Sequence, residues 1–431
     1  MTAPTGFVGL THLGIVSSIG WASLGGPVVA MDPDPEPVAA LREGRLPVHE
    51  PSLAELFASS RPAMTFSIDP SSLRECRLVI IAADIPTDDA NVSDTSLVLR
   101  LVDAVVPHLH DDATLAVMSQ VPVGFTRQLA ERVTQARPGL RFRLYYWVET
   151  LVIGNAVERY VRPERIIIGC ADPRVPLTAE LAAGLLRFAC PILPMSYESA
   201  ELTKTAINLY LCAGVTYANT LSDLCERVGA DWSEVTPALR LDGRIGPAAY
   251  IRLGLGIAGG NLERDMITLR SLCRSHDVDA LFIDTMLDCN ARRPEWVHRA
   301  LREHLLREVA HPTISVWGLA YKKNTRSTKN SVSRKVIREL DGRAEVRAYD
   351  PLVTADDVGA SIRLAADRNE ALAGADCLLV LTDCDEFAAP APAALRSMRR
   401  RLIIDGVGIV DPSRTDLAGV RLVQMGRPSR G

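Results

Sequence analysis

The chain has 431 residues, of which 47% are hydrophobic and 23% are charged, and its formal net charge is -4. At roughly 100–200 residues per domain, this length predicts two or three domains rather than one core. The composition excludes low-complexity and collagen-like chains, and the slightly acidic balance argues against nucleic acid as a partner.

The cysteines and histidines are scattered, and no C-x-x-C pair occurs among the nine cysteines. This pattern favours reduced thiols in a cytoplasmic protein, and it predicts neither a disulfide framework nor a metal site. The stretch 5–31 carries no charged residue, but glycines interrupt it and it lacks a basic flank. A buried strand–helix–strand unit is therefore favoured over a membrane segment or an export signal.

Short apolar runs alternate with helical patterns in the first part of the chain, which predicts an α/β fold. Strands are expected at 27–31, 78–83, 114–118 and 165–169, and helices at 38–43, 52–59, 96–109 and 127–136. Residues 198–228 contain no proline and one glycine, and their helical apolar spacing predicts one long helix. More helix is expected from 232 to about 306. Four strands of a second parallel sheet then follow at 313–317, 345–349, 377–381 and 401–404.

A glycine motif near the start of the chain points to a dinucleotide. In a dinucleotide-binding βαβ unit, glycines after the first strand let the backbone approach the pyrophosphate, and an acidic residue about 20 positions later binds the ribose. Gly6, Phe7, Val8 and Gly9 take this place, with Pro4 where the first glycine is expected. The few residues before them leave no room for a full first strand. Asp32 predicts NAD rather than NADP, because a carboxylate repels a 2′-phosphate. A glycine-rich turn of any α/β protein is the alternative.

Several segments, taken in order, resemble the UDP-glucose/GDP-mannose 6-dehydrogenase family, whose members use NAD to oxidise a nucleotide-sugar alcohol to the acid. The segments are GFVGL (6–10), EGRLPVHEPSLAELF (43–57), SQVPVGFT (119–126), ETLVIGNAVERYVRPERIIIG (149–169), ELTKTAINLY (201–210), DGRIG (242–246), GLGIAGGNLERD (254–265), VWGLAYKKNTRSTKNS (316–331), AYDP (348–351) and IIDG (403–406).

The resemblance implies two Rossmann-like doubly wound α/β domains joined by a central helical region with one long helix. Residues 1–194 would bind NAD, and residues 309–431 would bind the nucleotide of a nucleotide-sugar substrate. The central region, 195–308, would form a homodimer through the 198–228 helix.

The resemblance also implies the chemistry of the site, with one departure. In the family a cysteine four residues before an aspartate adds to the aldehyde, so that a second hydride can leave. Here Asn261 replaces that cysteine, while Asp265 is retained. Because an amide is too weak a nucleophile for this addition, the second oxidation loses its usual route. The chain is thus similar to a divergent member that lacks the catalytic cysteine.

The remaining expected site residues are carried over from the family's motifs. Lys204 would stabilise the alkoxide, Asp265 would accept the proton through a water, and Asn208 and Asn261 would hold sugar hydroxyls. Glu149 and Gln120 would line the water site. Ser119 and Lys329 would join the cofactor contacts. Substrate contacts would also come from Glu149, Lys204, Asn208 and the following residues: Leu151, Arg244, Tyr250, Arg252, Gly256 and Lys323. Val407 stands where the family has a substrate-binding arginine.

Three hypotheses follow. The first is an NAD-dependent dehydrogenase that stops after one two-electron oxidation, at an aldehyde or ketone. The second is a full four-electron oxidation to the uronic acid by a route that needs no thiol. The third is a non-catalytic nucleotide-binding homologue. The sugar, the base and the oxidised carbon are not determined by the sequence.

Overall fold

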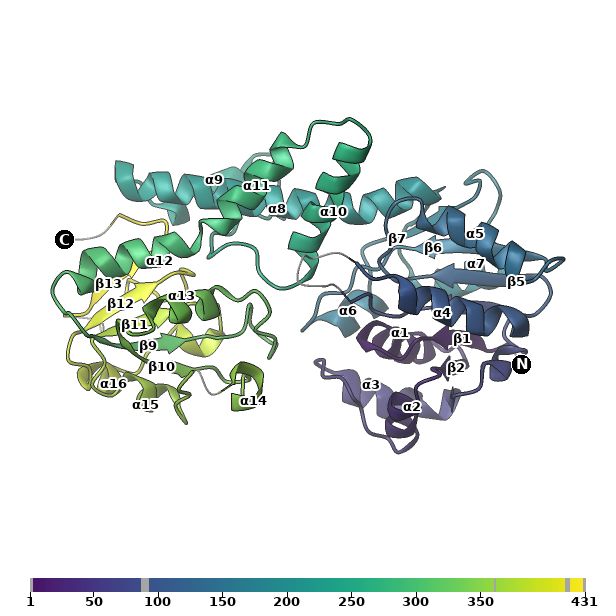
Figure 1. The fold of residues 1–431 in the computed structure, drawn as a ribbon, viewed down its shortest axis with the longest axis horizontal. Helices are drawn as coiled ribbons and strands as arrows, with labels where there is room; N and C mark the ends of the chain where they lie inside the picture. Colours follow the sequence, from purple (N-terminus) through teal and green to yellow (C-terminus); the bar gives the residue numbers. More distant parts are fainter. Residues whose placement is uncertain (1–2, 87–92, 360–361, 415–418, 429–431) are drawn as a thin grey trace. The chain divides into compact units, whose positions relative to one another are not determined.

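The structure is a computed structural model that describes residues 3–86, 93–359, 362–414 and 419–428. The chain divides into two compact units, Met1–Ile207 (unit 1) and Asn208–Gly431 (unit 2), and each contains one β-sheet (Figure 1). Within the described part of the chain, no helix combines the length and the apolar composition that a membrane crossing needs.

Unit 1 is built on an eight-stranded sheet with the order β3-β2-β1-β4-β5-β6-β7-β8. Neighbouring strands are parallel except β6 and β7. The strands are β1 (Thr5–Val8), β2 (Val28–Met31), β3 (Met64–Ser67), β4 (Leu78–Ile81), β5 (Ala113–Val117), β6 (Phe142–Trp147), β7 (Ile166–Cys170) and β8 (Ile192–Ser196). The strand order reverses between β1 and β4, so the loops after these strands flank the crevice where such sheets bind ligands.

Helices cover both faces of this sheet. They are α1 (His12–Ser23), α2 (Pro35–Arg42), α3 (Leu53–Ser60), α4 (Ser96–Val105), α5 (Phe125–Ala136), α6 (Ala156–Val161) and α7 (Ala179–Leu185). One hydrophobic core contains buried residues of α1, α3 and α6, and another contains buried residues of α4 and α5. The central strands are apolar along their whole length because both faces are covered, as in the LVII run of β4.

The long helix α8 (Tyr197–Val228) begins in unit 1 and continues into unit 2. The prediction of one helix over 198–228 is therefore confirmed. In unit 2 it is followed by α9 (Trp232–Leu241), α10 (Asn261–Ser275), α11 (Leu281–Ala291) and α12 (Pro294–Leu301).

The second sheet of the chain lies in unit 2 and is parallel throughout, in the order β10-β9-β11-β12-β13. Its strands are β9 (Thr313–Trp317), β10 (Glu345–Tyr349), β11 (Cys377–Val380), β12 (Leu402–Asp405) and β13 (Arg421–Gln424). The helices are α13 (Val332–Leu340), α14 (Ala355–Val358), α15 (Arg368–Leu372) and α16 (Pro392–Arg396). The order reverses between β9 and β11, so the loops after these two strands mark the ligand crevice of this sheet. Two doubly wound α/β sheets are thus confirmed.

The expectation that the chain lacks a full first strand is wrong. Gly6, Phe7 and Val8 belong to β1, which pairs with β2 on one side and β4 on the other, and all three are buried. Pro4 therefore precedes a strand and does not stand in a phosphate-binding turn. Four further strands, β3, β6, β8 and β13, were not predicted from the sequence. The β8 segment, ILPMS, contains a proline and only partly buried residues, so it lacks a continuous apolar run.

Candidate active site

The turn after β1 carries the dinucleotide fingerprint, five residues later than the sequence analysis placed it. Gly9, Thr11 and Gly14 occupy the three glycine positions of G-x-G-x-x-G. Gly9 has φ +94°, which favours glycine, and a Cβ at Gly14 would lie 1.7 Å from the carbonyl oxygen of Gly9. The first and third positions thus require glycine for the turn and for close packing of α1. The second position is threonine. The spacing GLTHLG, counted from Gly9, was the signal that could have found this turn.

Asp32 follows β2 directly, where the fingerprint places the residue that binds the ribose. Its Oδ2 accepts a hydrogen bond from the backbone N–H of Leu10 at 2.6 Å, and its Oδ1 accepts one from Asp34 N–H at 2.9 Å. Asp32 and the two fingerprint glycines fit NAD, and Asp32 would bind its ribose hydroxyls.

A second carboxylate lies at the start of α1. Asp84 follows β4, and its Oδ2 accepts a hydrogen bond from Leu13 N–H at 3.0 Å. The backbone N–H of Asp84 donates to the hydroxyl of Thr11 at 2.8 Å. Thr11 and Asp84 therefore change both the shape and the charge of the turn on the side where the fingerprint holds the phosphates.

Ser119 and Gln120 follow β5 in unit 1. Ser119 is fully buried, and its hydroxyl donates to the carbonyl of Ala83 at 2.6 Å. It therefore ties two loops of the crevice together. Glu201 on α8 is also fully buried, and it accepts hydrogen bonds from Gly124 N–H at 2.6 Å and Thr126 N–H at 2.8 Å. Burial raises the pKa of Glu201. This carboxylate, which the sequence analysis missed, fastens the start of α5 and the loop containing Gln120 to α8.

A lysine–carboxylate pair also lies in unit 1. Lys204 on α8 is 8% exposed, and its Nζ lies 3.2 Å from Oε2 of Glu149. The other oxygen of Glu149 accepts the backbone N–H of Leu151. The structure thus brings together Lys204, Glu149 and Leu151, all of which the sequence analysis singled out.

In unit 2 the predicted residues Asn208, Asn261 and Asp265 form a second group. Asn261 is the first residue of α10, and Asp265 lies one helical turn later. Asp265 is 2% exposed and accepts a hydrogen bond from Asn208 Nδ2 at 2.5 Å. The adjacent Arg264 places its Nε 3.1 Å from the other carboxylate oxygen, so the buried charge of Asp265 is compensated. On α8, Asn208 follows Lys204 by one turn, so both side chains project from the same side of that helix.

Two cysteines, Cys212 and Cys273, lie on the helices that carry Asn208 and Asp265. Cys212 lies one turn after Asn208 and is fully buried. Burial, and to a smaller extent the charge of Asp265, raises the pKa of Cys212 to about 12. Its thiol is therefore protonated at neutral pH and shielded from solvent. Cys273 lies on α10 two turns beyond Asp265.

The glycine loop, residues 254–260, is held by contacts from two later segments of unit 2. Gly256 has φ +100°, and a Cβ there would lie 2.5 Å from Oδ1 of Asn290. The amide of Asn290 binds both the N–H of Ile257 (2.6 Å) and its carbonyl (3.0 Å). The carbonyl of Lys329 accepts Gly259 N–H at 3.1 Å, and a Cβ at Gly260 would lie 3.7 Å from Lys329 Nζ. Lys329 therefore lies beside the start of α10.

A groove of about 180 Å³ runs along this loop and the loops after β9 and β11. Its lining includes Tyr250, Arg252, Gly256, Lys322, Asp383 and Val407. Arg252 forms an ion pair with Asp383 at 3.0 Å.

Two cations that the sequence analysis assigned to the substrate lie elsewhere in unit 2. Lys323 pairs with the exposed Asp385 at 2.9 Å, whereas its neighbour Lys322 lines the groove. The side chain of Arg244 is 90% exposed and pairs with Asp242 at 2.7 Å. A lysine pair in YKK does not by itself reveal which member faces inward.

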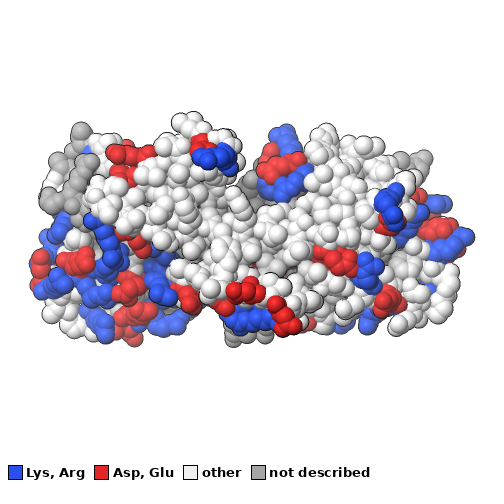
Figure 2. Space-filling model, turned by 90° about the horizontal axis from the view of Figure 1, so that it is seen from above, with Lys and Arg blue, Asp and Glu red and all other residues white. Residues whose placement is uncertain are grey.

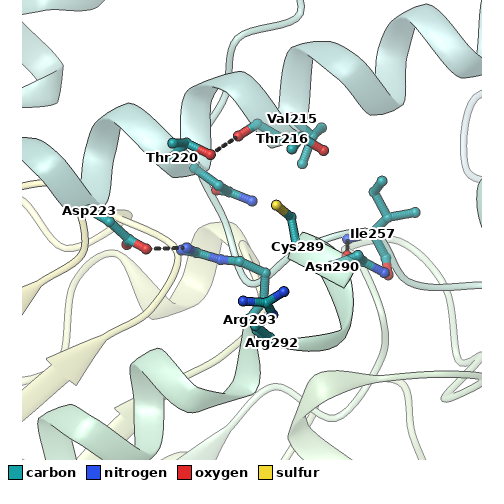
Figure 3. A pocket seen from close by; sticks show the side chains of 10 residues that line it. Val215, Thr216, Thr220, Asp223, Ile257, Cys289, Asn290, Arg292 and Arg293 are labelled. Carbon is teal, nitrogen blue, oxygen red and sulfur yellow. Dashed lines mark hydrogen bonds and ion pairs between the residues drawn. The ribbon is translucent and has the colours of Figure 1, made fainter. Parts of the chain in front are cut away.

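A separate cavity of about 180 Å³ lies between α8 and the end of α11 (Figure 3). Arg293 is buried and pairs with Asp223 of α8 at 2.9 Å, and Cys289 and Ile257 line the same cavity. The ion pair fastens α8 to the segment between α11 and α12. Because Ile257 belongs to the glycine loop, this cavity adjoins that loop.

Three family models match the chain. They describe the NAD-binding domain (residues 4–183), the central domain (198–292) and the UDP-binding domain (315–412) of the UDP-glucose/GDP-mannose dehydrogenase family. UDP-glucose 6-dehydrogenases are similar to the chain throughout. The Haloferax volcanii enzyme is 31% identical over 94% of this chain and 96% of its own length, and the Rhizobium meliloti enzyme is 29% identical over 98% and 99%. A solved UDP-glucose dehydrogenase from Pyrobaculum islandicum has a TM-score of 0.87 at 26% identity, covering 99% of this chain and 98% of its own.

Proposed function

The chain belongs to the UDP-glucose/GDP-mannose dehydrogenase family of NAD-dependent oxidoreductases, and we propose that it oxidises an alcohol of a nucleotide sugar in a single two-electron step. The product of that step is an aldehyde or a ketone. The observation that carries the proposal is Asn261, which begins α10 one turn before the buried Asp265.

The absence of a usable thiol in this group supports a single step. Carrying an aldehyde on to an acid needs a nucleophile that adds to it before a second hydride leaves. The amide of Asn261 cannot do this. The nearby thiol of Cys212 is fully buried, and its pKa is raised to about 12.

The retained polar residues support the first oxidation. NAD, when bound, supplies the hydride acceptor. Lys204 stabilises the alkoxide that forms as the hydroxyl proton leaves, and Asp265 takes up that proton through a water. Asn208 and Asn261 orient the sugar hydroxyls. Glu149 orients Lys204, because its carboxylate lies 3.2 Å from the ammonium.

The experiment measures NADH formed per substrate consumed, with UDP-glucose, UDP-N-acetylmannosamine and GDP-mannose as probes. We expect one equivalent of NADH and a carbonyl product that hydroxylamine traps in full. Two equivalents with an acid product contradict the proposal. Absence of turnover with all three probes, despite binding of NAD, favours the non-catalytic homologue.

Asn261→Cys is the sharper variant. If the geometry around Asp265 is retained, a thiol at this position restores the missing nucleophile, and the stoichiometry rises toward two equivalents. Asn261→Ala is the matched control, because it removes the amide and adds no nucleophile at this position. A variant with cysteine that still yields one equivalent indicates that position 261 does not face the reacting carbon.

We also propose that the protein forms a homodimer through α8. Exposed apolar residues follow one side of α8 from near its middle to its end: Tyr210 (72%), Tyr217 (45%), Leu224 (51%) and Val228 (65%). Figure 2 looks down on the helices and shows an area with few charged side chains on unit 2, next to a charged rim. An exposed apolar stripe of this kind is typical of a protein interface.

The nine free cysteines support a reducing, cytoplasmic location.

A further inference from the structure

The second position of the dinucleotide fingerprint is changed in this chain, and the change affects where a phosphate can lie. At that position a glycine normally lets the backbone approach the pyrophosphate. Thr11 adds a Cβ, a methyl group and a hydroxyl there. The hydroxyl does not cap its own helix but accepts the backbone N–H of Asp84 at 2.8 Å. The side chain of Thr11 is thereby fixed at the mouth of the turn.

Asp84 adds a negative charge at the same place. The start of α1 offers N–H groups and the positive end of a helix dipole, which together attract the pyrophosphate of a dinucleotide. One of these N–H groups, that of Leu13, already donates to Oδ2 of Asp84 at 3.0 Å. Asp84 is exposed, so its carboxylate lies on the solvent side of the turn, where a ligand approaches.

Among the residues that the structure describes, no cation forms an ion pair with Asp84 at this turn. The first turn of α1 contains His12, and its Nε2 contacts the buried carboxylate of Glu50 at 2.8 Å. Glu50 in turn accepts the N–H groups of Gly154 and Ala156. The imidazole is therefore already paired with a carboxylate of its own unit.

We propose that Thr11 and Asp84 set the affinity of unit 1 for NAD by occupying the phosphate side of the fingerprint turn. The carboxylate of Asp84 takes a hydrogen-bond donor that the pyrophosphate uses, and it repels the incoming phosphates. NAD must displace Asp84 from Leu13 N–H in order to bind. The cofactor is then held mainly through its ribose, at Asp32, and through the remaining N–H groups of α1.

The test is a calorimetric titration of the full-length protein and its variants with NAD and, separately, with adenosine, which lacks phosphate. Asp84→Asn keeps the shape of the side chain and removes its charge, so the Kd for NAD should fall about tenfold at low salt, while the Kd for adenosine should stay the same. Thr11→Gly restores the glycine and should tighten NAD binding further in combination with Asp84→Asn. Asp69→Asn is the matched control, because Asp69 also accepts a backbone N–H, that of Ser71, at 2.8 Å on another turn of unit 1. This control should leave both Kd values unchanged.

Salt concentration separates charge from shape. Repulsion between exposed charges is screened as ionic strength rises, so the ratio of the wild-type and Asp84→Asn Kd values should shrink between about 0.02 and 0.5 M salt. The proposal is overturned if Asp84→Asn leaves NAD affinity unchanged, weakens it, or alters adenosine binding equally. Because the readout is binding, the result is independent of how many oxidation steps the enzyme performs.

Discussion

Variants of the ion pair between Lys204 and Glu149 can separate two roles of Lys204, one in stability and one in catalysis. Both side chains are largely buried, at 10% and 13% exposure, and their charged atoms lie 3.2 Å apart. In Lys204→Met the carboxylate of Glu149 stays in place without its cation. Leaving one partner of a buried pair uncompensated costs about 3–5 kcal/mol. Because this pair retains some solvent contact, we expect a loss of unfolding free energy near 3 kcal/mol.

The same variant should also lose turnover. Removing one group that stabilises a developing oxyanion lowers kcat by about 10²–10³-fold, which corresponds to about 2.7–4 kcal/mol. The affinity for NAD should not change, because Lys204 lies on α8 and the fingerprint turn follows β1.

The double variant Lys204→Met/Glu149→Gln distinguishes the two roles. Removing the unpaired charge should return most of the lost stability, measured by urea unfolding, while kcat stays low in an NADH absorbance assay. Recovery of both stability and wild-type turnover in the double variant would refute the reasoning, because it would reduce Lys204 to a partner for Glu149.

Three further predictions concern unit 2. Asp405 is fully buried and accepts four hydrogen bonds, so Asp405→Asn, which removes one acceptor oxygen, should lower the unfolding free energy by about 2–4 kcal/mol in urea titration. Burial raises the pKa of Asp405 above 3.8, so the folded state binds a proton at this carboxyl more tightly than the unfolded state does. The contribution of Asp405 to the unfolding free energy should therefore decrease as the pH rises from 3.8 through the raised pKa. A wild-type stability curve that matches that of Asp405→Asn across this window contradicts the assignment. Cys212 should resist a thiol reagent such as DTNB in the native protein at pH 8 and react only after unfolding, since its pKa is raised to about 12; rapid native labelling at this residue argues against its burial. Tyr217→Asp should convert the dimer to a monomer in light scattering with no loss of helix content, and an unchanged mass excludes α8 as the interface.

The class of fold and most of the strands and helices could be predicted from the amino-acid sequence alone. Apolar runs such as 78–83 and 313–317 predict buried parallel strands, because side chains covered on both faces need no polar alternation. The helix at 198–228 was also evident, since helical spacing of apolar residues over such a length has few alternatives. The asparagine that replaces the family's cysteine at position 261 is visible in the sequence, because it depends only on the identity of one residue within a motif.

The position of the cofactor turn in the sequence could be assigned only from the folded structure. GFVG and GLTHLG overlap in the sequence, and both resemble parts of the fingerprint. The choice between them depends on where β1 ends, which follows from its pairing with β2 and β4. The same holds for Lys322 and Lys323, and for the capping role of Glu201, because these contacts join residues far apart in the chain. Local pattern specifies which elements form, whereas the direction in which a polar side chain points is fixed by neighbours that the chain brings together only on folding.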